Sequence, residues 1–255
     1  MDILNLFHVQ EMIAVVTGGG IGFMIAKALV SAGASKVYIL GRRKDKLELA
    51  AAQHESLIPL QCDITSKESL QAAVDTIAKD VGFINLLVAN SGILGPTSSF
   101  VPGLGVQELR KNIFEDTAME EFAQTFHVNT TATYFSMFAF LELLDAGNKN
   151  ALDGGFGKPL GEGSKVPSIQ SQVIITSSVG AFLLFPSEMA NTIIESRDPS
   201  TESVDDPNFI PARRFGGEEE MSGTILYLAS RAGSFCNGLI LANDGGRLGV
   251  TMSTY

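Results

Sequence analysis

Residues 12–22 read MIAVVTGGGIG, and this stretch decides how the rest of the chain is interpreted. Met12–Val16 is a continuous apolar run, which is typical of a parallel strand buried on both faces. Thr17–Gly20 follows as a turn, and Ile21 opens an amphipathic stretch that ends near Ala32. Glycines directly after a strand let the backbone approach a pyrophosphate at the N-terminus of the next helix. The stretch therefore predicts a dinucleotide site, with a tight strand-to-helix turn that binds nothing as the open alternative.

Length, composition and charge limit the classes of protein that fit this chain. The 255 residues, 45% hydrophobic and 18% charged, can bury a full core, and one α/β domain over residues 1–255 accounts for them. The formal net charge is −10 at pH 7. Nucleic acids and anionic membranes are bound chiefly by clustered Lys and Arg, so neither is an expected partner. A small molecule is the expected partner.

The cysteines and the apolar stretches bear on the cellular compartment. Cys62 and Cys236 lie far apart in the sequence, and the first ten residues contain neither a basic region nor a long apolar one. We therefore expect no disulfide framework and no secretion signal. The most apolar helical stretch, Tyr134–Leu144, is too short to span a bilayer and contains Glu142. We expect no membrane segment and a reducing, cytoplasmic location.

Two arginines follow the second apolar run, Val37–Leu40. In dinucleotide-binding folds an acid at the end of the second strand binds the ribose hydroxyls, whereas arginine suits a 2′-phosphate. Arg42 and Arg43 therefore favour NADP over NAD. A solvated basic loop is the alternative.

Polar residues also follow the third and fourth apolar runs. Leu57–Gln61 leads to Asp63, which is expected at the carboxyl end of a strand, where open α/β sheets bind their ligands. Ile84–Ala89 leads to Asn90 and Gly92, which can present amide groups to a cofactor. An Asx turn that closes the strand is the alternative for Asn90. The alternation of strands and helices predicts an α/β fold with a Rossmann-like, doubly wound parallel sheet.

Three further segments carry structural expectations. Thr65 with Glu68, and Thr117 with Glu120, predict capping boxes at the starts of two helices. The segment from residue 147 to residue 171 is rich in Gly, Pro, Lys and Ser and predicts a flexible surface insertion. Residues 238–243, GLILAN, predict a last strand that an Asp-Gly turn closes.

Together, these motifs resemble those of the classical short-chain dehydrogenases/reductases. The match consists of the glycine-rich turn, the arginine after strand two, the aspartate of Cys62–Thr65 and the stretch Ala89–Gly92, where the family usually has Asn-Asn-Ala-Gly. The resemblance covers nearly the whole chain and implies an NADP(H)-dependent oxidoreductase that reduces a carbonyl or oxidises an alcohol. No metal site is expected. The implied cofactor-binding residues are Gly18, Ile21, Gly22, Arg42, Arg43, Asp63, Asn90, Gly92 and Ser187.

The resemblance also implies two catalytic roles. Asn129 lies in a His-Val-Asn string within a long expected helix and matches the family's asparagine that holds the active-site water and the catalytic lysine. A helical asparagine bonded only to backbone is the alternative. Ser178 follows the expected strand Gln172–Thr176 and matches the serine that hydrogen-bonds the substrate carbonyl. An ordinary serine at a strand end is the alternative.

The chain departs from the family at the acid that a reductase needs. Hydride addition to a carbonyl leaves an oxyanion that must be protonated, and the family uses a tyrosine with a lysine four residues later. After Lys165 the sequence contains no lysine, and its only later tyrosines are Tyr227 and Tyr255. We therefore expect that a helix–strand unit of roughly 30 residues or more is missing after Ala181–Leu183. The turn TGGGIG is also two residues shorter than the family's TGxxxGxG.

These departures leave two functions open. The first is the NADP(H)-dependent oxidoreductase. The sequence around Phe185–Met189 and Phe215–Met221 resembles the branch of the family that contains 3-oxoacyl carrier-protein reductases and rhamnolipid-type reductases. By analogy, its pathway is polyketide or other secondary metabolism. The alternative is a catalytically impaired relative that binds a nucleotide or small ligand, or that performs non-redox chemistry. A homo-oligomer stays open, although the family's usual interface helix belongs to the missing unit.

Overall fold

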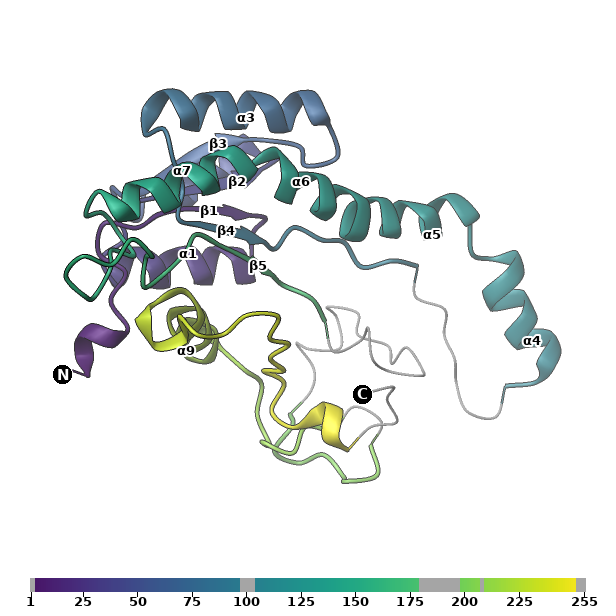
Figure 1. The fold of residues 1–255 in the computed structure, drawn as a ribbon. Helices are drawn as coiled ribbons and strands as arrows, with labels where there is room; N and C mark the ends of the chain where they lie inside the picture. Colours follow the sequence, from purple (N-terminus) through teal and green to yellow (C-terminus); the bar gives the residue numbers. More distant parts are fainter. Residues whose placement is uncertain (1–2, 97–103, 179–197, 207–208, 251–255) are drawn as a thin grey trace. The chain divides into compact units, whose positions relative to one another are not determined.

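The computed structural model describes residues 3–96, 104–178, 198–206 and 209–250, and it contains one parallel sheet in the order β3-β2-β1-β4-β5 (Figure 1). The strands are β1 (Ile13–Thr17), β2 (Lys36–Gly41), β3 (Leu57–Gln61), β4 (Leu86–Ala89) and β5 (Gln172–Ile175). The order reverses at β1, which lies between β2 and β4. This arrangement confirms the predicted Rossmann-like, doubly wound α/β sheet.

Helices cover both faces of this sheet. The α-helices are α1 (Ile21–Ser31), α2 (Lys44–Ala51), α3 (Lys67–Asp80), α4 (Val106–Arg110), α5 (Met119–Phe126), α6 (Thr133–Ala139), α7 (Leu141–Leu152) and α9 (Glu218–Ala229). The short 3-10 turns are η1 (Leu4–Leu6), η5 (Arg231–Gly233) and η6 (Arg247–Gly249), and the π-helical segments are η2 (Lys111–Glu115) and η3 (His127–Ala132). No helix within the described residues is long and apolar enough to cross a membrane.

Two apolar cores lie on the two faces of the sheet. One core joins α1 and α9 to β1, β2 and β4, and the other joins α3, α6 and α7 to the opposite face (Figure 1). Every residue of β1 and of β4 is buried, because helices cover both sides of these strands. Asn85 ties the start of β4 to β1: its backbone N–H donates to the Ile13 carbonyl (2.8 Å), and its side-chain oxygen accepts from the Ile13 N–H (2.9 Å).

A second bond network holds α3 against the start of β2. The Lys36 ammonium donates to both carboxylate oxygens of Asp80 (2.9 and 2.8 Å), and the Tyr38 hydroxyl donates to the same carboxylate. The hydrogen bond from Lys36 is the main cause that lowers the pKa of Asp80 below its ordinary value. Burial is the main cause that raises the pKa of Tyr38, so this phenol stays protonated.

The helix caps differ from the predicted capping boxes. Ser66, one residue after the predicted Thr65, caps α3: its hydroxyl oxygen accepts from the Ser69 N–H at 3.1 Å. Thr65 instead donates its hydroxyl to Asp63. At α5 the N-cap is Ala118, whose side chain accepts no hydrogen bond, and the Thr117 hydroxyl donates to the Asn112 carbonyl. Both predictions were wrong because the threonine side chains bond backward, Thr65 to Asp63 and Thr117 to Asn112 in η2.

Both ends of the expected insertion from 147 to 171 are packed. Residues 147–152 belong to α7, whereas the prediction placed them in a loop. Phe156 and Ile169 are buried in the core that α1 and α9 share. The Ile169 N–H donates to the Gly157 carbonyl (3.3 Å), and this bond closes the neck of a loop whose residues 160–166 are exposed. Only the middle of the segment is therefore a surface loop.

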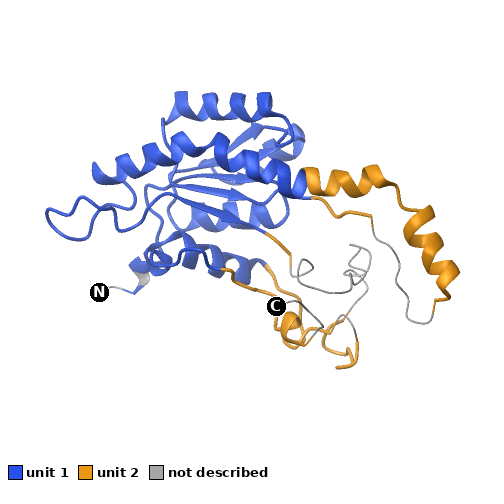
Figure 2. Cartoon of the chain, turned by 45° about the vertical axis from the view of Figure 1, so that its right-hand side comes forward, with its two compact units in different colours: residues 1–92, 128–176, 218–239 blue, residues 93–127, 177–217, 240–255 orange. Residues whose placement is uncertain are grey.

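The chain divides into two compact units, as Figure 2 shows. Unit 1 contains residues 1–92, 128–176 and 218–239, and with them the sheet and both cores. Unit 2 contains residues 93–127, 177–217 and 240–255. Within unit 2 the Ala212 N–H donates to the Gly245 carbonyl (2.9 Å), and the Asp244 carboxylate accepts from the Leu248 N–H (2.7 Å). The single domain over residues 1–255 stays a prediction.

The predicted last strand does not form in the described part of the chain. Residues 238–243 have no strand assignment there, and the sheet ends at β5. A strand forms only when a neighbour supplies its backbone hydrogen bonds. The prediction from the apolar run alone was therefore wrong for this structure.

Candidate functional site

The glycine-rich turn lies between β1 and α1, at the carboxyl end of the central strand. Gly18 (φ 83°) and Gly20 (φ 57°) both adopt left-handed backbone conformations, which glycine tolerates without strain. Gly20 caps α1 without a side-chain hydrogen bond. A Cβ placed on Gly19 or Gly20 would meet no atom within 4 Å. The space beside the turn is therefore open, although the N–H groups of Gly22, Phe23 and Met24 already donate to the Gly19 and Gly20 carbonyls.

Asn90 supports this turn from the end of β4. Its side-chain amide donates to the Thr17 carbonyl at 3.0 Å, and its backbone N–H donates to the Thr17 hydroxyl oxygen, also at 3.0 Å. A Cβ on Gly22 would lie only 2.6 Å from the Asn90 amide nitrogen, and a Cβ on Gly18 would lie 3.0 Å from it. Three of the predicted cofactor residues, Gly18, Gly22 and Asn90, are thus packed directly together.

Arg42 and Arg43 follow β2 at the same end of the sheet. The Gly18 N–H donates to the Leu40 carbonyl (2.8 Å), so the end of β2 lies beside the glycine turn. Both arginines are exposed, and Arg43 is the N-cap residue of α2. The Arg42 carbonyl accepts from the Gln61 side-chain amide (3.0 Å), which joins this loop to the end of β3. Two guanidinium groups are therefore available to an anionic group near the turn.

Asp63 organises the loop after β3. Its carboxylate accepts from the Thr65 N–H (3.0 Å) and from the Thr65 hydroxyl (2.7 Å). Its backbone N–H donates to the Ser69 hydroxyl oxygen at 2.9 Å. Burial is the main cause that raises the pKa of the neighbouring Cys62 thiol, so this cysteine is not an activated nucleophile. Asp63 thus shapes the carboxyl edge of the sheet through bonds within its own loop.

Asn129 lies in the π-helical segment η3, a type of segment that often occurs at functional sites. A Cβ on Gly92 would lie 3.2 Å from the Asn129 side-chain oxygen, so these two predicted residues are neighbours. Ser178 is exposed and belongs to unit 2. Ser187 lies outside the described residues.

Two residues of this site were not among the predicted ones. The Thr17 hydroxyl oxygen accepts from the backbone N–H groups of both Asn90 and Ser91, at 3.0 Å each. Thr17 is almost fully buried, although its side chain is polar. Ser91 also packs against the turn, because a Cβ on Gly18 would lie 3.1 Å from the Ser91 hydroxyl oxygen. A threonine directly after a buried apolar run was the available signal for such a link between neighbouring strands.

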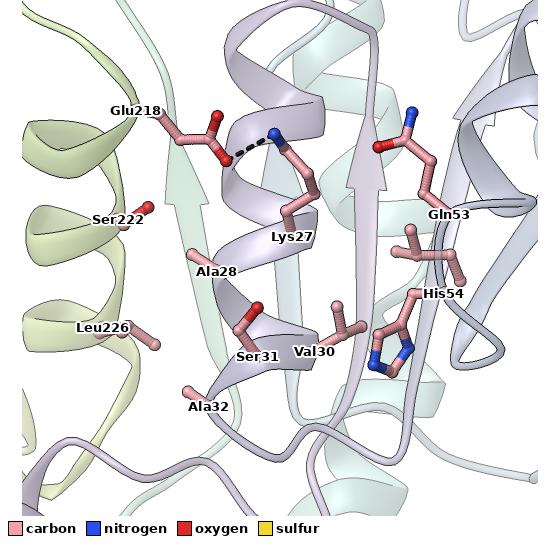
Figure 3. A pocket seen from close by; sticks show the side chains of 11 residues that line it. Lys27, Ala28, Val30, Ser31, Ala32, Gln53, His54, Glu218, Ser222 and Leu226 are labelled. Atoms are coloured by element: carbon pink, nitrogen blue, oxygen red, sulfur yellow. Dashed lines mark ion pairs between the residues drawn. The ribbon is translucent and has the colours of Figure 1, made fainter.

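A shallow cavity of about 360 Å³ lies elsewhere in unit 1, along the second half of α1 (Figure 3). Its walls come from α1, α9 and the segment between α2 and β3, and Lys27 and Glu218 form an ion pair across it at 2.5 Å. None of the predicted site residues lines it. We therefore assign the candidate site to the carboxyl edge of the sheet and not to this cavity, because open α/β sheets bind ligands at that edge.

Tyr227 is not a replacement for a catalytic tyrosine. Its hydroxyl lies 3.4 Å from the Cys236 sulfur, in hydrogen-bonding distance. This hydrogen bond is the main cause that raises the pKa of Tyr227, whereas a general acid–base tyrosine needs a lowered pKa. Tyr227 is also on α9, whose buried residues Ile225 and Ala229 pack on α1. The place of Tyr227 on this packed helix therefore indicates a structural role.

The chain is similar to known proteins over almost its whole length. The family model described as short chain dehydrogenase matches residues 12–151. The Short-chain dehydrogenase/reductase SAT3 of Stachybotrys chartarum is 54% identical, covering 91% of this chain and 100% of the relative. The Short-chain dehydrogenase/reductase PhomF' of Diaporthe leptostromiformis is 40% identical, covering 98% and 96%. The Pseudomonas aeruginosa RhlG/NADP active-site complex has the same fold, with a TM-score of 0.68 at 21% identity over 96% of this chain and 99% of that one.

The alignments also show that relatives contain segments that this chain lacks. The alignment with PhomF' extends over 298 positions, and the one with SAT3 over 272 positions, whereas this chain has 255 residues. Each alignment therefore includes positions of the relative without a counterpart here. The missing Tyr-x-x-x-Lys unit stays a prediction, because these lengths do not say which segments differ.

Proposed function

Since the chain belongs to the short-chain dehydrogenase/reductase family, we propose that it binds NADP(H) as an oxidoreductase for a carbonyl or alcohol, in polyketide or other secondary metabolism. The observation that carries the proposal is the glycine turn. Asn90 hydrogen-bonds to this turn, and the end of β2, which Arg42 and Arg43 follow, lies beside it. Members of this family use nicotinamide cofactors. The pathway rests on analogy with fungal relatives such as SAT3 and PhomF'.

The residues at the carboxyl edge fit a dinucleotide phosphate. The surface above Gly19 and Gly20 is open, and a Cβ at either position would fill it. The N-terminus of α1 would hold the pyrophosphate, because the helix dipole favours an anion there. Arg42 and Arg43 would bind the 2′-phosphate, which an arginine recognises through paired hydrogen bonds. When bound, NADPH supplies the hydride for carbonyl reduction.

The chain's own contribution to proton transfer is incomplete. The substrate oxygen gains negative charge as its carbon receives the hydride, and this oxygen needs a proton and a hydrogen-bond donor. Ser178 is the proposed donor, and Asn129 would hold a water molecule that leads protons to the site. No tyrosine in the sequence is followed by a lysine four residues later. We therefore propose that this exact chain retains cofactor binding and has little or no dehydrogenase turnover.

Binding and turnover are tested separately. We expect NADPH to bind with higher affinity than NADH, as measured by the change in NADPH fluorescence on titration with the protein. Turnover is measured by loss of absorbance at 340 nm with simple ketones, and we expect none above background. Oxidation of NADPH that Ser178→Ala abolishes would overturn the proposed impairment. Equal affinity for NADPH and NADH would overturn the assignment of Arg42 and Arg43.

The alternative function is ligand binding or non-redox chemistry on the same fold, and the missing tyrosine and lysine favour it. Its signature is binding of a nucleotide or small ligand without consumption of NADPH. Sequencing the native transcript across the Ala181–Phe185 junction distinguishes the two functions. Extra codons for a Tyr-x-x-x-Lys helix would restore an ordinary reductase. A transcript that matches this sequence would favour the binding protein.

A further inference from the structure

Asn237 and Gly238 follow α9 and η5, near the end of the 218–239 segment of unit 1. Asn237 is the only asparagine in the sequence that a glycine follows. Both residues are exposed, and so is Leu239 after them. Gly238 has a φ of 67°, and a Cβ placed on it would meet no atom within 4 Å. Within unit 1, the pair is therefore accessible to water at its side chain and at its backbone.

Hydrogen bonds hold the chain just before this pair, but they do not hold the pair itself. The Cys236 N–H donates to the Gly233 carbonyl (2.8 Å), and the Cys236 sulfur lies 3.4 Å from the Tyr227 hydroxyl oxygen. Among the described residues, no hydrogen bond involves the Asn237 side chain or the Gly238 N–H. A hydrogen-bonded backbone amide reacts only after it has opened locally. The Gly238 nitrogen needs no such opening.

The Asn90–Ser91 pair shows the opposite arrangement. The Asn90 side-chain amide donates to the Thr17 carbonyl at 3.0 Å, and the Ser91 N–H donates to the Thr17 hydroxyl oxygen, also at 3.0 Å. These bonds hold both the carboxamide and the backbone nitrogen that follows it. A reaction between the two groups requires both bonds to break first. Asn90 is therefore an internal reference for a held asparagine in the same protein.

We propose that Asn237 is a site of spontaneous deamidation, because the fold leaves its carboxamide and the Gly238 nitrogen free to react. The Gly238 nitrogen attacks the side-chain carbonyl carbon of Asn237 and forms a new C–N bond, which closes a cyclic imide. The bond from this carbon to the side-chain nitrogen breaks, and ammonia leaves with the proton of the Gly238 N–H. Glycine suits this attack because it has no Cβ beside the nitrogen.

Water completes the modification by opening the imide. It adds to one of the two imide carbonyl carbons, and the bond from that carbon to the Gly238 nitrogen breaks. The product is a carboxylate, as aspartate or as isoaspartate, and no atom is oxidised or reduced. The carboxylate adds a negative charge to a chain whose formal net charge is −10. Isoaspartate also lengthens the backbone of the segment that leads from unit 1 into unit 2.

Peptide mass spectrometry on the full chain tests this proposal, after incubation at mildly alkaline pH. We expect the peptide with Asn237 to gain the mass of a carboxamide-to-carboxyl change at least about tenfold faster than the peptide with Asn90. Methylation by protein isoaspartyl methyltransferase should identify isoaspartate in the same peptide. Equal rates for the two peptides, or no gain at Asn237, would overturn the proposal.

One variant removes the reaction, and a second builds a matched control elsewhere in unit 1. Asn237→Gln should abolish the mass gain, because its longer side chain closes the imide ring poorly. Asp153→Asn creates a second exposed Asn-Gly pair, but the Gly154 N–H donates to the Ala151 carbonyl (3.3 Å). We expect slower deamidation at position 153 than at Asn237.

The melting temperatures of both variants show whether they are folded, and they should equal that of the wild type because both side chains are exposed. Deamidation at position 153 as fast as at Asn237 in a folded variant would contradict the role of the free Gly238 nitrogen. A mass gain in this peptide that persists in Asn237→Gln would also contradict the proposal.

Discussion

The strands β4 and β5 are neighbours with similar apolar sequences, yet their surroundings differ. β4 reads Leu-Leu-Val-Ala and is buried at every residue, because β1 pairs with one edge and helices cover both faces. β5 reads Gln-Val-Ile-Ile and leaves Val173 and Ile175 exposed. The difference teaches that β4 lies in the packed interior of the sheet, whereas β5 is an edge strand that the described residues leave partly uncovered.

The largest expected effect comes from truncating equivalent apolar side chains in the two strands. Leu87 in β4 is fully buried, so Leu87→Ala should lower the free energy of unfolding by about 2–5 kcal/mol. Ile175→Ala in β5 removes a half-exposed side chain and should cost less than about 0.5 kcal/mol. Urea denaturation measures both. Equal losses would mean that β5 is covered in solution.

The second effect concerns the glycine turn between β1 and α1. Gly22→Ala forces a Cβ toward the Asn90 amide, so we expect a loss of about 1–3 kcal/mol in the free energy of unfolding together with weaker NADPH binding. Gly19→Ala is the matched control, because its Cβ meets no atom. The control should keep its melting temperature and weaken only NADPH binding. A control variant as unstable as Gly22→Ala would contradict the described packing.

A smaller effect is expected at the end of β2. Arg42→Ala should weaken NADPH binding about tenfold, or about 1.4 kcal/mol, and should leave NADH binding nearly unchanged, because only NADPH carries the 2′-phosphate. Titration by fluorescence measures both affinities. The melting temperature of the variant serves as a control and should not change, because the Arg42 side chain is exposed. An equal loss for NADH would contradict recognition of the 2′-phosphate.

The smallest effect is a pH dependence of stability, at the amino-terminal end of β2. The hydrogen bond from Lys36 lowers the pKa of Asp80 below its ordinary value of 3.8, so the ionised form stabilises the folded state. This contribution is fully present above the ordinary pKa and is lost as the pH falls through the lowered pKa. Asp80→Asn should therefore melt slightly below the wild type at pH 7, and the difference should disappear in acid. A difference that is constant with pH would contradict this electrostatic origin.

The first four strands could be predicted because their signals are local. Each is an apolar run that ends in turn residues, and buried parallel strands need little else to be identified. The positions of Asn90 and the glycine turn follow from the same signals, since parallel strands bring their carboxyl ends to one edge. The position of Thr17 after a buried apolar run indicates a link to a neighbouring strand. The residues that bond to its hydroxyl group, Asn90 and Ser91, could not be predicted, because a hydroxyl group gives no indication of which strand it will meet.

Two of the errors occurred where long-range contacts decide the structure. Residues 238–243 have the pattern of a strand, but a strand also needs a neighbour that the sequence pattern does not supply. Phe156 and Ile169 are single apolar residues in a polar segment, so no periodicity indicated that they are buried. The cap of α3 moved by one residue because Thr65 bonds to Asp63 and leaves Ser66 as the cap.

The bonds between Ile13 and Asn85 have a consequence for synthesis on the ribosome. These bonds close one end of the central strand and join residues 72 positions apart. At about 5–20 residues per second, the nascent chain emerges for about 4–14 seconds with β1 lacking one of its two neighbours. During this interval a strand that is buried at every residue in the folded protein has an open edge. Until residue 85 leaves the exit tunnel, this edge of the nascent chain is therefore open to pairing with other chains.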